Sequence, residues 1–223
     1  MRHIGANDGH ARRNRLYLGR GRVMKMTIFN SGGCLLLAIA ALITGCGKQA
    51  RTEAVQLTKV LTEKKANFAS ADAIEKDLVS SARAWCGGIT ANGAGRGVEL
   101  GQNATVAAEL AKSAVAASAA LSQVRQAVDG QPLKGEYPRS VRNVLITQLT
   151  TRQRLLQDIR ALLEQSAPQF LEYRHDKAYV GNTYPEGIGK LNTLLQAYKA
   201  PEDGVGTALA ALKAKYKLPD SEL

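Results

Sequence analysis

The chain has few of the side chains on which most catalytic and metal sites depend. It holds three cysteines, three histidines and eleven aromatic residues among its 223 positions. No CxxC, CxxCH or HExxH sequence occurs, so zinc, c-type haem and thioredoxin-like redox chemistry lack their usual ligands. A Gly-x-Ser-x-Gly nucleophile elbow is also absent. We therefore expect no cofactor, no metal and no catalytic residue, and a protein that is not an enzyme.

A short apolar run near the N-terminus is the most informative feature that is present. The run covers Cys34 to Ile43 and is much shorter than the roughly 20 residues that a membrane-spanning helix needs. Lys25 supplies a positive charge before it, and small residues follow it. This arrangement is typical of a cleaved export signal. The run ends in the sequence Ile43-Thr44-Gly45-Cys46.

This ending resembles the lipobox of bacterial lipoproteins, which reads aliphatic, small, Gly or Ala, then Cys. The resemblance implies cleavage between Gly45 and Cys46, diacylglycerol on the Cys46 thiol and acylation of the new amino terminus. The alternative is a buried apolar segment that happens to end in cysteine. Gly47 follows where inner-membrane lipoproteins usually carry Asp, so the resemblance favours the outer membrane, with the protein facing the periplasm. Nothing after the signal resembles a particular family.

The expected organisation follows from the position of this signal. Counted from Met1 it would be about 45 residues long, against a usual 15 to 30, whereas a start at Met24 or Met26 gives an ordinary length. We expect residues 1–23 to be an overextended start or a leader lost with the signal. The signal peptide is then 24–45, a lipidated tether is 46–52, and one helical domain is 53–223.

The positive charge of the chain lies largely in its first segment. The formal net charge is +11, but residues 1–45 contain seven Lys or Arg and one Asp, which leaves +5 for residues 46–223. We therefore expect no nucleic-acid partner. The remaining charge suits a domain beside an anionic membrane surface, where each nearby basic residue adds about 1 kcal/mol of attraction.

Apolar residues recur at helical spacing, and no strand-like alternation occurs, which predicts an all-α fold. We expect a bundle of about five to six helices, with a four-helix core and C-terminal additions. Ser70 is read as an N-cap, Gly87-Gly88 as a helix stop, and Thr183 to Glu186 as a capping box. The predicted helices cover residues 57–68, 70–86, 103–128, 138–165, 183–198 and 201–218, and Pro168 is expected to end or kink the fourth.

Several other features have ordinary structural interpretations. The glycine-rich stretch 87–101 lacks the Lys-Ser/Thr of a phosphate-binding loop and is expected to be a connecting loop. Cys86 either links to another molecule or is simply buried, and burial is favoured because it closes an amphipathic run. The acidic residues are expected to be solvated charges, and so are four arginines of the helix at 138–165, namely Arg139, Arg142, Arg154 and Arg160. Arg152 of the same helix is a basic break in its apolar stripe.

The segment 169–184 holds four of the nine aromatic residues that follow Cys46, and it is the one candidate site. Its speculative binding residues are Tyr173, Arg174, His175, Asp176 and Tyr179. A histidine near a carboxylate could act as a base, and aromatic rings could form a pocket wall. Adjacent residues point in different directions, however, so the alternative is a connector pinned to the bundle by its rings.

The sequence thus predicts a membrane-anchored periplasmic lipoprotein that acts as a non-catalytic interaction, adaptor or envelope-assembly protein. Its expected partners are the membrane, through the lipid anchor, and a protein of the envelope. The alternative is a small-ligand-binding protein or an enzyme with a site near the aromatic segment 169–184.

Overall fold

A computed structural model describes residues 48–219, and these are all-helical, as predicted. The described helices are α2 (Lys48–Asn92), α3 (Val98–Asp129), α4 (Glu136–His175), α5 (Glu186–Ala197) and α6 (Gly204–Tyr216). No strand occurs in this part of the chain. The predicted signal peptide and Cys46 lie outside the described residues. Residues 48–52, which we expected in the tether, belong to α2.

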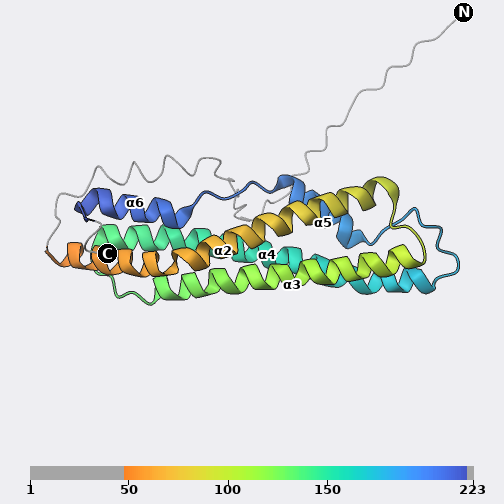
Figure 1. Cartoon of the computed structure of the whole chain (residues 1–223), viewed down its shortest axis with the longest axis horizontal. Coiled ribbons are helices and arrows are strands. Elements are labelled where there is room, and N and C mark those ends of the chain that lie inside the picture. Colours follow the sequence, from red (N-terminus) through yellow and green to blue (C-terminus); the bar gives the residue numbers. More distant parts are fainter. Residues whose placement is uncertain (1–47, 220–223) are drawn as a thin grey trace, which may run out of the picture. The chain divides into compact units, whose positions relative to one another are not determined.

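Three long helices and two short ones form the bundle (Figure 1). Helices α2, α3 and α4 run antiparallel to their neighbours, and α3 packs against both α2 and α4. Helices α5 and α6 follow one another along α2 and α4, and each contacts both of them. The last two helices are therefore not additions to a four-helix core. Together they form its fourth member, which is interrupted at residues 198–203.

The two helix ends predicted within α2 were wrong. The helix passes through Ser70, because Phe68 and Ala71 on either side of it are both buried on the inner face. It also passes through Gly87-Gly88, where each glycine weakens a helix by about 1 kcal/mol relative to alanine. Burial of Ile89 beyond the glycines outweighs that loss.

The end of α2 lies six residues later than predicted, so the connecting loop is much shorter than 87–101. Gly93 follows the last helical residue with φ +82°, a backbone conformation that other residues rarely adopt. Its amide donates to the carbonyl of Ile89 at 2.8 Å. The loop spans residues 93–97, and α3 begins at Val98.

Pro168 does not end α4. The helix continues to His175 although proline has no amide to donate to the preceding turn. Ser166 donates its hydroxyl to the carbonyl of Leu162 at 2.7 Å, and Phe170 beyond the proline is fully buried. Packing of the segment after Pro168 therefore sustains the helix.

The predicted capping box at Thr183 does not form. Helix α5 begins at Glu186 with Pro185 at its cap, and no side chain caps it. Thr183 is instead held in the preceding loop, where its carbonyl accepts from the Ala94 amide and the Tyr179 hydroxyl. Helix α6, in contrast, has a side-chain N-cap: the Asp203 carboxylate accepts from the Gly206 amide at 2.8 Å.

Helix α3 packs closely through small side chains, as its alanine content predicted. Ala107, Ala114 and Ala117 are almost fully buried in the core of the bundle. Among the helices of residues 48–219, α3 is the one that is long and apolar enough to cross a membrane by length and composition. A core helix meets the same two criteria. The buried alanine face of α3 is typical of a core helix.

Candidate functional site

The residues predicted as a site at 169–184 lie at the end of the bundle where α4 ends and a loop leads to α5. His175 and Asp176 are both exposed, and no hydrogen bond joins their side chains among the described residues. The Asp176 carboxylate accepts instead from the Ala178 amide at 2.8 Å. Arg174 is also exposed and lies beside Gly101 of α3. The structure therefore does not bring a base and a carboxylate together here.

The aromatic residues of this segment hold the loop. The rings of Tyr173 and Tyr179 stack with their centroids 4.8 Å apart and their planes at 13°. The Tyr179 hydroxyl donates to the Thr183 carbonyl at 2.6 Å. Arg96, from the loop after α2, donates through Nε and Nη2 to the Val180 carbonyl at 2.9 and 2.7 Å. These contacts favour the interpretation of the segment as a connector pinned to the bundle.

Cys86 is fully buried, which confirms the favoured expectation for this thiol. Burial raises its pKa from about 9 to about 12, because the thiolate would lose its hydration in the core. The thiol is therefore protonated and inert at neutral pH. Among residues 48–219, no group of three or more His, Cys, Asp or Glu side chains is placed to hold a metal ion.

A buried charge cluster lies near the middle of the bundle, and we did not expect it. Arg152 of α4 donates through Nε to Oε2 of Glu75 on α2 at 2.8 Å, and through Nη2 to Asp72 at 3.1 Å. The Tyr198 hydroxyl donates to the other oxygen of Glu75 at 2.9 Å. The guanidinium also lies over the Phe68 ring, 5.0 Å from its centroid. The prediction that the acids are solvated was wrong for Glu75, which is fully buried.

The cluster stands beside the interruption between α5 and α6. A hollow of about 300 Å³ opens there, with Glu75, Arg152 and Tyr198 in its wall. The Nη1 atom of Arg152 is buried and has no hydrogen-bond partner within residues 48–219. At the end of α5, Arg83 of α2 donates through Nη2 to the Leu195 carbonyl at 2.5 Å. This bond satisfies a terminal carbonyl of α5. Buried charges and backbone groups thus fix the place where the fourth helix breaks.

A second surface feature is a groove between α3 and α4, which we name the α3–α4 groove. Its volume is about 560 Å³, and its wall contains Arg125 from α3 together with Arg154 and Arg160 from α4. None of its twelve lining residues is acidic. We expected the arginines of α4 to be spread around its axis, but two of them reach one groove and α3 adds a third.

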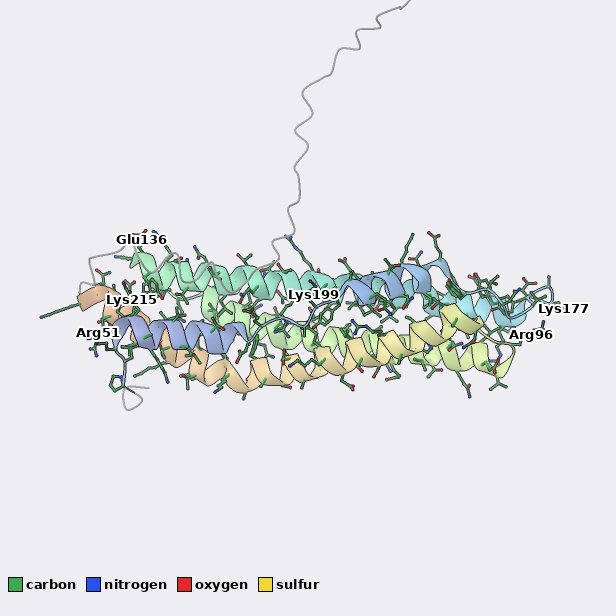
Figure 2. All side chains as sticks on the ribbon, turned by 90° about the horizontal axis from the view of Figure 1, so that it is seen from above. Arg51, Arg96, Glu136, Lys177, Lys199 and Lys215 are labelled. Atoms are coloured by element: carbon green, nitrogen blue, oxygen red, sulfur yellow. The ribbon has the colours of Figure 1, made fainter. Side chains whose placement is uncertain are left out.

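The end of the bundle where α2 begins is rich in basic side chains. Figure 2 shows Arg51, Glu136 and Lys215 there, with Arg96 and Lys177 at the opposite end. Glu53 is buried at this end and its Oε2 accepts from the Lys134 and Gly135 amides at 2.9 and 2.6 Å. We call this region the basic end; among the residues that the structure describes, its basic residues are Lys48, Arg51, Lys134, Arg139, Arg142, Lys213, Lys215 and Lys217.

No protein-family model, no curated protein and no solved structure matches this chain. The function must therefore be inferred from the sequence and from the geometry of residues 48–219.

Proposed function

We propose that the protein is a lipoprotein of the bacterial outer membrane that serves as a non-catalytic adaptor or assembly protein of the envelope. The observation that carries this proposal is the lipobox-like sequence Ile43 to Cys46 placed directly before the bundle. Helix α2 begins at Lys48, so Gly47 alone separates the proposed anchor from the first helical residue. The bundle would then stand on the membrane without a long linker.

The charge of the basic end supports this orientation. Within residues 48–219, eight basic residues lie there against three acidic ones, Glu53, Asp129 and Glu136. Lipid headgroups of negative charge attract such a surface, by about 1 kcal/mol for each basic residue close to it. Two or three acyl chains on Cys46 would add stable anchoring, which a single chain does not provide.

The length of α2 supports an adaptor role. Its 45 residues correspond to about 67 Å at 1.5 Å per residue. A bundle anchored at Lys48 would present the sides of its helices over that distance, a form suited to contact with a partner. The alternative, a ligand-binding protein or an enzyme at 169–184, has less support because His175 and Asp176 are exposed and not joined to each other.

The anchor is tested by the mass of the purified protein. A C-terminally tagged chain, solubilised from envelopes in detergent, should begin at Cys46 and carry the added mass of diacylglycerol and an N-acyl chain. Cys46→Ala should abolish that mass and release the protein from the membrane. Cys34→Ala is the matched control, because Cys34 lies in the segment that is proposed to be removed. An unmodified Cys46 in the purified protein would refute the anchor.

The adaptor role is tested in the cell. Crosslinking followed by purification of the tagged protein and mass spectrometry should recover one partner in stoichiometric amount. Density-gradient separation of the two membranes should place the protein in the outer membrane fraction. Recovery of the acylated chain without any partner would count against the adaptor role.

A further inference from the structure

The α3–α4 groove combines arginines from both of its helices with small side chains from α3. Arg154 is exposed and Arg125 half-buried, and within residues 48–219 neither makes an ion pair. Arg160 pairs with Glu164 at 2.8 Å on the surface of α4, an interaction of the kind that adds only a few tenths of a kcal/mol. The groove therefore holds two guanidinium groups without an acidic partner and a third that is weakly paired.

Apart from Arg125, the α3 side of the groove is made of small side chains and one valine. Ala114, Ser118 and Ala119 lie in its wall, and Val115 beside them is 43% exposed. Small side chains let another helix approach closely, and an exposed valine gains stability when it is covered. The groove thus offers a shallow apolar surface on α3 beside a row of three arginines, one from α3 and two from α4.

The spacing of the three arginines fits a helix. Gln153 of α4 donates to the Ser118 carbonyl of α3 at 3.3 Å, which sets the register of the two antiparallel helices. In that register Arg125 lies level with residue 146 of α4. The three arginines then span about 14 helical positions, or about 21 Å, in steps of about 12 and 9 Å. Acidic residues at heptad spacing on a docked helix recur about every 10.5 Å, close to both steps.

We propose that the α3–α4 groove binds an acidic amphipathic helix of a partner protein. The apolar stripe of that helix packs on the exposed residues Val115 and Ala119, and its carboxylates pair with Arg125 and Arg154. Arginine is suited to this role because its planar guanidinium binds a carboxylate through two parallel hydrogen bonds. This inference rests on the proposed adaptor role but not on the lipid anchor.

Binding is measured on the acylated protein as purified from envelopes, in nonionic detergent micelles. The probe is a fluorescein-labelled 21-residue helical peptide with an Ala/Leu stripe flanked by glutamates at heptad spacing. A matched peptide carries glutamine in place of every glutamate. We expect the glutamate peptide to bind in a saturable, salt-sensitive manner, and at least about tenfold more tightly than the glutamine peptide.

The location of binding is tested with charge reversals of equal size. Arg125→Glu combined with Arg154→Glu should weaken binding at least about tenfold. Lys59→Glu combined with Lys65→Glu makes the same change in net charge on the exposed face of α2 and should leave binding unchanged. Circular dichroism of both variants verifies that they are folded. A single Ser122→Cys change at the groove should allow disulfide trapping of a peptide that carries one cysteine.

Four outcomes would overturn the inference. The two double variants could weaken binding equally, which would indicate attraction to net charge rather than to the groove. The two peptides could bind with equal affinity, or neither could bind. Vesicles that contain phosphatidylglycerol could instead bind through Arg125 and Arg154 while the peptide does not bind. That result would assign the groove to lipid. The full chain with Cys46→Ser should bind the peptide normally, so failure of the anchor and failure of the groove are distinguishable.

Discussion

The guanidinium of Arg152 on α4 lies against the carboxylate of Glu75 on α2, with its Nε and Nη2 atoms 2.8 and 2.7 Å from the same oxygen. The side chain of Arg152 is 7% exposed and that of Glu75 is not exposed at all. Tyr198, from the segment after α5, donates to the second oxygen of Glu75. One ion pair therefore joins α2, α4 and the interrupted fourth helix.

Loss of either charge of this pair should be strongly destabilising. Arg152→Met leaves Glu75 charged in the core, and breaking a buried pair in this way reduces the free energy of unfolding by about 3–5 kcal/mol. Urea denaturation followed by circular dichroism measures the change. Arg139→Met, at an exposed position of the same helix, is the control and should change stability by no more than about 0.5 kcal/mol.

The double variant Arg152→Met with Glu75→Met distinguishes the cost of an unpaired buried charge from the cost of lost packing. Replacement of both charges by apolar side chains of similar volume removes the buried unpaired charge, so most of the lost stability should return. If the double variant is as unstable as the sum of the single variants, the two residues are not energetically coupled.

Because of Glu53, the free energy of unfolding should decrease at acidic pH. Hydrogen bonds from the Gly135 amide, and from Gln49 and the Lys134 amide, lower the pKa of its carboxyl below the usual 4.5. The unfolded chain therefore binds the proton more readily, and stability that is present above pH 4.5 should be lost as the pH falls below it. Urea denaturation at several pH values should show this loss, and a smaller one in Glu53→Gln. Equal acid dependence in both proteins would contradict the prediction.

Cys86 should be unreactive until the protein unfolds. Because burial raises its pKa to about 12, iodoacetamide at pH 8 should modify the thiol only in denaturant. Between about pH 9 and 12 the folded protein holds a proton that the unfolded chain releases, so its stability should fall as the pH rises, by up to about 1.4 kcal/mol per pH unit. Cys86→Ala should remove this contribution. Rapid modification of the folded protein would show that the thiol is accessible.

Replacement of either of two glycines within α2 by alanine should stabilise the protein. An added methyl group at Gly87 or Gly88 would have no neighbour within 4 Å, and alanine favours a helix over glycine by about 1 kcal/mol. Gly87→Ala and Gly88→Ala should therefore each raise the free energy of unfolding by about 0.5–1 kcal/mol. Gly93→Ala should instead lower it, since Gly93 has φ +82° and lies against the backbone of Gly181. Thermal melts of the three variants give the comparison.

Helical spacing of apolar residues was sufficient to predict the fold class, but not the ends of α2. Gly87 and Gly88 each weaken a helix by about 1 kcal/mol, and Ser70 weakens it by less. Burial of Phe68 and Ile89 in the bundle contributes more, and that burial depends on neighbouring helices which a local pattern does not contain. Pro168 illustrates the same limit, because fully buried Phe170 lies just beyond it.

The charge cluster left one trace in the sequence. Arg152 interrupts an otherwise apolar stripe of α4, and a charged residue in such a place implies a buried partner. Identification of Glu75 as that partner requires the register of α2 against α4, which is a tertiary property. The α3–α4 groove was missed for a related reason, since Arg125 and Arg154 come from different helices.

The interruption of the fourth helix divides the bundle into parts of unequal local stability. Helices α5 and α6 have 12 and 13 residues, too few to be stable helices in water by themselves. Each depends on docking against α2 and α4, whereas the three long helices also hold one another. Amide hydrogen exchange should therefore occur soonest in α5 and α6, as two separately opening units, and last in the three-helix remainder.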